Sequence, residues 1–232
     1  MEIFEYTDKG GREKNEDYVA HRIIDDTHSV FVVADGMGGL HFGEVAAKTV
    51  AEAVVKEATL SVLHKPYVTQ EEVIRFAIDD ADGILERTRL GLEGHEMGTV
   101  VAALYINGLE GYIASVGDCR VYHYRGSQML FRSQVDSFLN RSDTAITAKQ
   151  LRTHTAAVVR GLFGDSLNPI GAIKPTKIDL LPGDTLLLCS DGIHKETNVE
   201  RFLTPTSNEL ISMLNEEASC FSDNISIIRV RI

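Results

Sequence analysis

The order of apolar and polar positions along the chain predicts many short strands and a few helices. Runs typical of strands, either alternating or continuously apolar, lie at residues 2–7, 18–24, 30–34, 99–106, 110–116, 120–124, 176–180, 184–189 and 225–232. Apolar residues recur with helical spacing at residues 43–58, 69–89 and 207–218, and Thr69 is a suitable N-cap for the second of these helices. Because two helices are followed by a run of strands, the order favours an α+β fold over a parallel βαβ fold.

The strands between residues 99 and 124 follow one another without an intervening helix. Asn107-Gly108 is a strong hairpin signal and Gly117-Asp118 separates the next pair, so we expect an antiparallel meander here. Residues 132–160 are polar and weakly patterned, and so long a stretch inside a compact domain is usually functional or mobile. Since no linker rich in glycine, proline or serine divides the chain, we expect a single domain over residues 1–232.

Composition and charge narrow the class of protein. Hydrophobic residues make up 44% and charged residues 25% of the chain, which are the proportions of a soluble globular protein. The formal net charge of -11 argues against nucleic acid as a partner. The sequence shows neither a signal peptide nor an apolar run long enough to span a bilayer, so we expect a cytoplasmic protein that does not bind membranes.

The three cysteines do not form a metal-binding motif. Cys119, Cys189 and Cys220 lie in or beside apolar runs and lack the spacing of a metal site. We therefore expect buried thiols in a reducing compartment.

Candidate chemistry lies at the ends of the strands, where carboxylates recur. Some follow an apolar run and others precede one: Asp35, Asp118 and Asp191 in the first group, and Glu16, Asp17 and Asp223 in the second. Because antiparallel neighbours bring the end of one strand beside the start of another, these acids can gather at one edge of the sheets. So much negative charge needs protonation or a cation, and oxygen ligands select hard ions such as Mg²⁺ or Mn²⁺. Each acid alone is better explained as a turn residue, whereas for the whole set a metal site and a series of ordinary turns are about equally well supported.

The acids lie in motifs that resemble those of the PPM-type (type 2C) metal-dependent protein serine/threonine phosphatases in their bacterial form. The motifs occur in order between residues 11 and 224, as Gly11-Arg12-x-x-Asn15-Glu16-Asp17, Val33-Ala34-Asp35-Gly36-Met37-Gly38-Gly39, Gly43-Glu44, Gly98-Thr99, Val116-Gly117-Asp118-Cys119-Arg120-Val121-Tyr122, Ser190-Asp191-Gly192 and Asp223-Asn224. No single motif is very specific, but the ordered set is. The resemblance implies two packed antiparallel β-sheets flanked by helices, an α-β-β-α sandwich with a binuclear metal site at one edge of the sheets.

The resemblance also assigns ligands to two Mn²⁺ or Mg²⁺ ions. Asp35 would bridge the two ions. Glu16 and the carbonyl oxygen of Gly36 would complete one site, and Asp191 and Asp223 would complete the other.

Three further roles follow from the resemblance. Asp118, together with Asp191, matches a third and weaker metal site, and Asp17 would orient a metal-bound water. Arg12, which alone would be interpreted as an exposed loop arginine, would bind the substrate phosphate through its planar fork of donors. The implied reaction is direct attack on phosphorus by a water that bridges the metal ions, without a covalent enzyme intermediate.

The chain departs from the family pattern in two places. Met37 stands where many animal members carry a histidine that is taken as the general acid. Bacterial members of the family commonly share this methionine, so we expect a metal-bound water to supply the leaving-group proton. His41 and His194 flank motifs but are expected to be surface or loop histidines. The usual Leu-Thr-x-Asp-His-Ser is replaced by Leu130-Phe131-Arg132-Ser133-Gln134-Val135. The flap-like segment at about 132–160 is also atypical, through Thr153-His154-Thr155-Ala156.

We therefore predict a metal-dependent protein serine/threonine phosphatase that acts as a monomer on phosphorylated proteins, with a cognate serine/threonine kinase as a candidate partner. Two alternatives stay open. The altered segment at residues 130–156 motivates the first, a weak or inactive pseudophosphatase that binds phosphoproteins. The second is a hydrolase of small-molecule phosphate monoesters.

Overall fold

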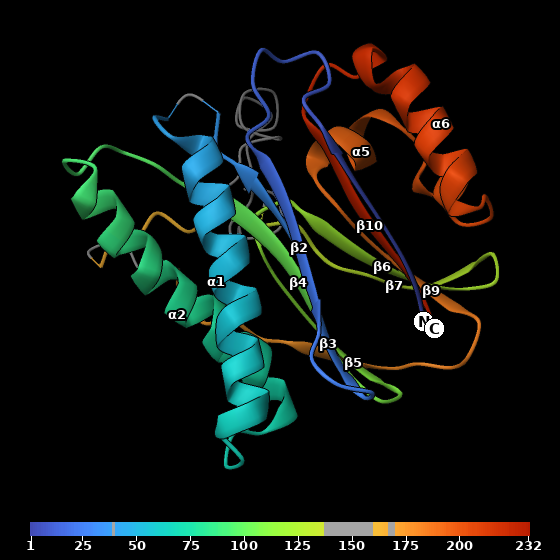
Figure 1. The fold of residues 1–232 in the computed structure, drawn as a ribbon, viewed down its shortest axis with the longest axis horizontal. Coiled ribbons are helices and arrows are strands. Elements are labelled where there is room, and N and C mark those ends of the chain that lie inside the picture. Colours follow the sequence, from blue (N-terminus) through green and yellow to red (C-terminus); the bar gives the residue numbers. More distant parts are fainter. Residues whose placement is uncertain (39, 137–159, 167–169) are drawn as a thin grey trace, which may run out of the picture.

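A computed structural model of the chain describes residues 1–38, 40–136, 160–166 and 170–232. It contains two five-stranded sheets in which every pairing is antiparallel (Figure 1). The strands of one sheet, in spatial order, are β1 (Glu2–Asp8), β10 (Ile225–Arg231), β9 (Asp184–Cys189), β6 (Arg120–Arg125) and β7 (Gln128–Arg132). Those of the other are β2 (Asp17–Ile23), β3 (His28–Gly36), β4 (Thr99–Asn107), β5 (Glu110–Val116) and β8 (Thr176–Asp179).

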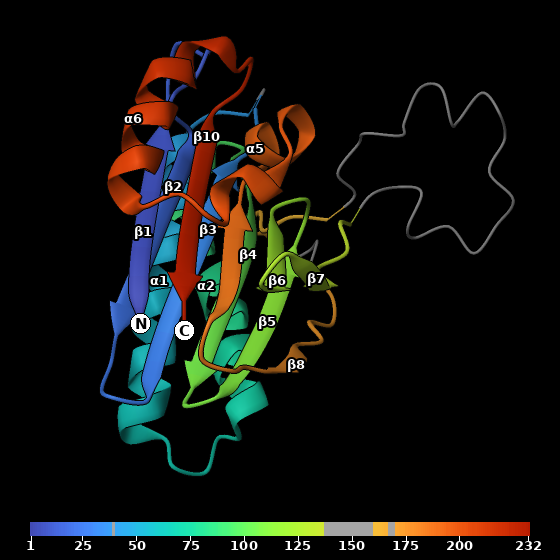
Figure 2. The same cartoon turned by 90° about the vertical axis from the view of Figure 1, so that its right-hand side faces the viewer.

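Helices cover the outer face of each sheet, which gives four layers (Figures 1 and 2). Helices α1 (Gly43–His64) and α2 (Gln70–Gly91) lie on the sheet that contains β3, and α5 (Asp191–Glu196) and α6 (Ser207–Glu217) lie on the sheet that contains β10. Two short 3-10 helices, η1 (Val199–Phe202) and η2 (Ala218–Cys220), flank α6. The predicted α-β-β-α sandwich is therefore confirmed. Within the described ranges, no helix has the length and apolar character needed to cross a membrane.

The continuous apolar run that became β3 is explained by its position in the middle of this stack. Val30, Val32 and Ala34 face the helix layer, while Phe31 and Val33 face the second sheet. Because both faces of the strand are buried, the sequence shows no polar alternation until Asp35.

Helix α1 is longer than the spacing of apolar residues predicts, and it extends beyond Ala58 to His64. Thr59 and Ser61 weaken the pattern, yet both are buried. Thr59 donates a hydrogen bond from its hydroxyl to the carbonyl of Val55 at 2.7 Å, so it is accommodated without leaving the helix. Helix α2 begins as predicted, because Thr69 and Glu72 form a capping box.

The predicted meander over residues 99–124 is wrong at its second turn. Strand β5 pairs with β4 and β8, whereas β6 pairs with β7 and β9 in the other sheet. Gly117, with a φ of 99°, carries the chain from one sheet to the other, a backbone conformation that favours glycine. Residues 120–124 form the expected strand, but with different neighbours.

The structure differs from the sequence-based predictions in two further respects, and one prediction lies outside the described residues. Strand β7 and helix α5 were not predicted, since the first is short and mostly exposed and the second has only 6 residues. Cys119 and Cys189 are buried as expected, but Cys220 is exposed at the end of η2. Most of the flap-like segment, residues 137–159, lies outside the described residues.

A buried carboxylate at the start of β9 joins three segments of the fold. Asp184 accepts hydrogen bonds from Arg125 Nε at 2.8 Å and Nη2 at 2.9 Å, from the His123 ring at 2.8 Å and from the Leu181 amide at 2.9 Å. Burial alone would raise the pKa of Asp184, but the hydrogen bonds from Arg125, Leu181 and His123 lower it below its ordinary value. Asp184 is therefore a structural anion away from the acids named above.

We expect Asp184→Asn to lower the free energy of unfolding by about 3 kcal/mol, or roughly 6–12 °C in Tm, because it leaves a buried His123 and an Arg125 contact uncompensated. Chemical denaturation at neutral pH measures the change. The control is Asp179→Asn on exposed β8, for which we expect less than about 0.5 kcal/mol. Equal unfolding midpoints for the two variants would contradict this role of Asp184.

Candidate active site

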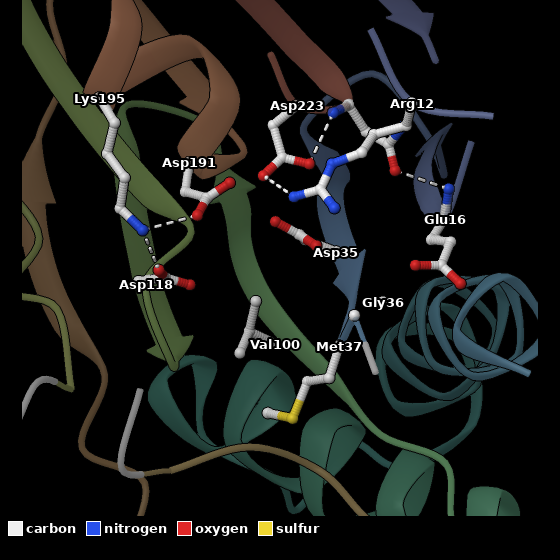
Figure 3. A pocket seen from close by; sticks show the side chains of 12 residues that line it. Arg12, Glu16, Asp35, Gly36, Met37, Val100, Asp118, Asp191, Lys195 and Asp223 are labelled. Atoms are coloured by element: carbon white, nitrogen blue, oxygen red, sulfur yellow. Dashed lines mark hydrogen bonds and ion pairs between the residues drawn. The ribbon is translucent and has the colours of Figure 1, made fainter. Parts of the chain in front are cut away.

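One cavity gathers the acidic residues that the sequence singled out (Figure 3). It has a volume of about 320 Å³ and is lined by Arg12, Glu16, Asp35, Gly36, Met37, Gly38, Val100, Asp118, Asp191, Lys195, Asp223 and Asn224. Every residue that the resemblance assigns to metal is in this set, and so is Arg12. Asp17 is the one predicted site residue that does not line the cavity.

Strand register brings the acids to this edge of both sheets. Asp35, the second-last residue of β3, lies opposite Asp17 in β2 and opposite Val100 in β4. Strand β5 ends at Val116, and Asp118 follows after Gly117; Asp191 begins α5 just after β9. Asp223 precedes β10, which pairs with β9. Both sheets therefore contribute acidic residues from strand ends that lie at the same edge.

Helix α1 begins directly against the end of β3. The Gly36 amide donates to the Glu16 carbonyl at 3.0 Å, and a Cβ at Gly36 would lie 2.5 Å from the backbone of Gly43. The Glu16 carboxylate in turn lies against Gly43, with Oε1 3.0 Å from where a Cβ on that residue would be. A side chain at position 36 would therefore push the helix and Glu16 away from Asp35.

Asp17 lies buried behind the cavity floor. Its Oδ2 accepts a hydrogen bond from the Ser190 hydroxyl at 2.7 Å, and Ser190 itself accepts from the Ser226 amide at 3.0 Å. Its Oδ1 is buried and has no hydrogen-bond partner among the described residues. Burial is the main cause that raises the pKa of Asp17 above its ordinary value.

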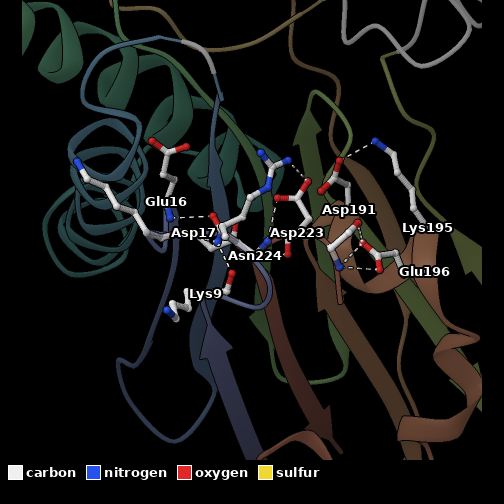
Figure 4. A network of polar contacts seen from close by, with 12 residues as sticks. Lys9, Glu16, Asp17, Asp191, Lys195, Glu196, Asp223 and Asn224 are labelled. Carbon is white, nitrogen blue, oxygen red and sulfur yellow. Dashed lines mark hydrogen bonds and ion pairs between the residues drawn. The ribbon is translucent and has the colours of Figure 1, made fainter. Parts of the chain in front are cut away.

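The loop that carries Arg12 and Glu16 is held by one amide side chain (Figure 4). Asn224 Nδ2 donates to the carbonyls of Lys9 and Lys14, each at 2.8 Å, and Asn224 Oδ1 accepts from the Glu16 amide at 2.9 Å. From the sequence, Asn224 is recognised only as part of the Asp223-Asn224 motif, with no role assigned to it. Its position beside Asp223 was the available signal.

Arg12 points into the cavity from this loop. Its Nη2 donates to Asp223 Oδ2 at 2.8 Å, while more than half of the side chain stays exposed. The guanidinium is therefore held at the rim by one hydrogen bond and has donors left for a ligand.

Lys195 is a cavity residue that sequence reasoning missed. Its ammonium group donates to Asp191 at 2.6 Å and to Asp118 at 2.9 Å (Figure 3). The spacing of four residues from Asp191 was a signal, but only if a helix starts at Asp191.

Neither flanking histidine lines the cavity. The His194 ring contacts the Asp118 carbonyl at 2.8 Å, and burial lowers its pKa, which favours the neutral form. His41 is exposed and its ring lies 5.3 Å from that of His95. Met37 packs its side chain over Gly98 and Gly161 and points away from the carboxylates (Figure 3).

The donors suit a hard divalent cation. The carboxylates of the cavity offer oxygen donors, and the pKa of Asp35 is raised well above its ordinary value, first by burial and then by the charges of Asp17 and Asp191. A bound cation would compensate that crowding. In the part of the chain that the structure describes, no three acidic, histidine or cysteine side chains stand in a ready-made metal cluster. Instead Arg12 and Lys195 pair with the carboxylates.

Comparisons with known proteins agree with this fold. A family model described as "Protein phosphatase 2C" matches residues 10–225. The chain is similar to the protein phosphatase PhpP of Streptococcus pneumoniae, with 27% identity over 203 residues that cover 83% of this chain and 79% of PhpP.

Solved structures share the whole fold. A bacterial serine phosphatase is 26% identical with a TM-score of 0.80, and the match covers 100% of this chain and 98% of that one. The catalytic domain of the serine/threonine protein phosphatase PstP, solved in complex with 2 manganese ions, is 24% identical with a TM-score of 0.72, covering 98% and 96% of the two chains. Because the family model matches residues 10–225, a range that includes every residue lining the cavity, the chain belongs to the protein phosphatase 2C family.

Proposed function

We propose that the chain is a metal-dependent protein serine/threonine phosphatase, which hydrolyses phosphoserine and phosphothreonine in proteins. The observation that carries the proposal is the convergence of Glu16, Asp35, Asp191, Asp223 and Arg12 on one cavity. The activity named for the relatives supports it. Residues 1–232 would act as one phosphatase domain, while a monomeric state and a cognate kinase remain predictions.

Two ions would be held by the residues assigned above. Asp35 would bridge them, Glu16 and the Gly36 carbonyl would bind the first, and Asp191 and Asp223 the second. The manganese ions bound to PstP support Mn²⁺, and Mg²⁺ suits the same oxygen donors. Arg12 contacts only Oδ2 of Asp223, so an ion at that carboxylate would either bind beside this hydrogen bond or replace it.

The ions supply a water nucleophile at neutral pH and stabilise negative charge on the phosphoryl group. Arg12 contributes two parallel donors to phosphate oxygens at the cavity rim. Asp17 would orient the attacking water, and its buried Oδ1, which has no partner among the described residues, is the oxygen that could accept a hydrogen bond for this role. None of the histidines that the structure describes lines the cavity, and we expect a metal-bound water to give the leaving oxygen its proton.

Hydrolysis of p-nitrophenyl phosphate by the purified chain tests the proposal. We expect turnover with Mn²⁺ or Mg²⁺, loss of turnover in excess EDTA, and recovery when Mn²⁺ is restored, because the nucleophile depends on the ions. Phosphoserine and phosphothreonine peptides should be hydrolysed in preference to sugar phosphates. Undiminished activity in EDTA would refute the metal mechanism, and phosphopeptide binding without turnover at saturating Mn²⁺ would indicate a pseudophosphatase.

Replacement of Arg12 by Ala is expected to lower kcat/KM for a phosphopeptide by about 10²-fold, or about 2.7 kcal/mol, because the phosphate loses its forked donor. Arg12→Lys should recover only part of the loss, since an ammonium cannot donate two parallel hydrogen bonds. Steady-state kinetics with saturating Mn²⁺ measures both. Arg22→Ala on exposed β2 is the control for the loss of one positive charge. Indistinguishable kinetics for the Arg12 and Arg22 variants would exclude Arg12 from phosphate binding.

A further inference from the structure

Lys195 holds two carboxylates at the side of the cavity opposite Arg12 (Figure 3). Its Nζ lies 2.6 Å from Asp191 Oδ2 and 2.9 Å from Asp118 Oδ2. The side chains of Asp118 and Asp191 are only 10% and 19% exposed, whereas that of Lys195 is 45% exposed. The ammonium therefore lies between two largely enclosed anions, although the Lys195 side chain as a whole is partly open to solvent.

The position of Lys195 on α5 brings its ammonium group to both carboxylates. Asp191 is the first residue of α5 and Lys195 follows four residues later, so the two side chains share one face of the helix. Asp118 comes from the turn after β5, and the His194 ring holds its carbonyl at 2.8 Å. Consecutive residues of α5 thus fix both the backbone and the carboxylate of Asp118.

A divalent ion cannot share these two oxygens with Lys195. Mg²⁺ or Mn²⁺ bound to both would lie roughly 2.1 Å from each oxygen, which overlaps the space that Nζ occupies. The ammonium would also repel a divalent ion at such a short separation. The other carboxylate oxygen of Asp191 carries no bond to Lys195 and stays available to the metal pair at Asp35.

We propose that Lys195 is the resident cation of the Asp118–Asp191 pair, so that the chain binds two divalent ions and excludes a third. The inference rests on the proposed function, because it counts ions beyond the pair centred on Asp35. Asp118 is then a positioning residue that holds Lys195, and Lys195 keeps Asp191 oriented toward that pair. The cavity retains a positive charge at this side even when metal is scarce.

Counting bound Mn²⁺ tests the inference without reference to activity. The full chain is freed of metal with EDTA, dialysed against rising MnCl₂, and the manganese per chain is measured by elemental analysis. We compare the wild type with Lys195→Ala, which opens the space, and with Lys195→Arg, which keeps a cation there. The control is Lys177→Ala, which removes a lysine that pairs with Glu110 on β5, away from the cavity. Circular dichroism confirms folding, and Lys195→Gln replaces Lys195→Ala if the alanine variant is unfolded.

We expect two ions for the wild type, Lys195→Arg and Lys177→Ala, and a third, weaker ion for Lys195→Ala. Three ions in the wild type would overturn the inference and leave the proposed phosphatase intact. Two ions in every variant would also overturn it, because Lys195 would then not be the group that excludes a third. No bound Mn²⁺ in any protein would overturn the proposed metal mechanism itself, together with the inference.

Discussion

Asp35→Asn is expected to lower kcat/KM for a phosphoserine peptide by at least about 10³-fold, which corresponds to about 4 kcal/mol of lost transition-state stabilisation. Asp35 is the acid at the centre of the cavity, where the fields of Asp17, Asp118, Asp191 and Asp223 meet. An amide offers a single neutral oxygen, so it cannot bridge two cations or balance their charge. The loss should therefore appear in kcat as well as in KM.

Steady-state kinetics at saturating Mn²⁺, together with a count of bound manganese, measures the effect. The matched control is Asp26→Asn in the exposed turn between β2 and β3, which removes the same charge from the surface and should leave both quantities unchanged. Wild-type turnover by Asp35→Asn would remove Asp35 from the proposed metal pair. If Asp35→Asn binds the wild-type number of ions but turns over slowly, Asp35 is not needed for metal binding and acts only by stabilising the transition state.

The strands and the common edge of the acids could be predicted because both follow from local pattern. The run from Val30 to Ala34 is apolar on both faces, as expected for a strand between a helix layer and a second sheet. Asp35 ends that run, and antiparallel pairing with β2 and β4 then fixes its neighbours. The sequence was sufficient to expect acids at one edge, although their roles remain proposals.

Features that depend on non-local pairing could not be predicted. Strand β6 belongs to the other sheet because it pairs with β9, which lies far away in the sequence, and the residues around Gly117 do not indicate this pairing. Asn224 stabilises a loop formed by residues 9–16, and nothing in the local sequence indicates that contact. Lys195 reaches Asp118 only because a helix of 6 residues starts at Asp191, and so short an element leaves no periodic signal.

The metal-free protein is expected to lose stability as the pH rises, and Asp35→Asn should remove much of that loss. Burial, followed by the charges of Asp17 and Asp191, raises the pKa of Asp35 well above its ordinary value. In the unfolded chain the carboxyl titrates near pH 4, at about its unperturbed pKa. Between these two pKa values the folded state binds one more proton than the unfolded state, so the free energy of unfolding falls with rising pH and stays low above the folded pKa.

Thermal unfolding in EDTA at pH 5 and pH 8 measures this difference. For the wild type we expect Tm to fall by roughly 4–8 °C, from a penalty of about 2 kcal/mol for an uncompensated buried charge. Asp35→Asn lacks this charge, so its Tm should fall less than that of the wild type; the remainder comes from Asp17, whose pKa is also raised by burial, and from the net charge of -11. Asp26→Asn keeps Asp35, so its Tm should fall as far as that of the wild type. Excess Mn²⁺ at pH 8 should raise the Tm of the wild type and not that of Asp35→Asn, because only the carboxylate gives the ions a bridging ligand. Parallel pH dependence in the wild type and Asp35→Asn would show that Asp35 is not the cause of the loss of stability. If the Tm of the wild type falls more than that of Asp35→Asn, the Asp35 carboxylate lowers the stability of the metal-free protein and is the same group that binds metal.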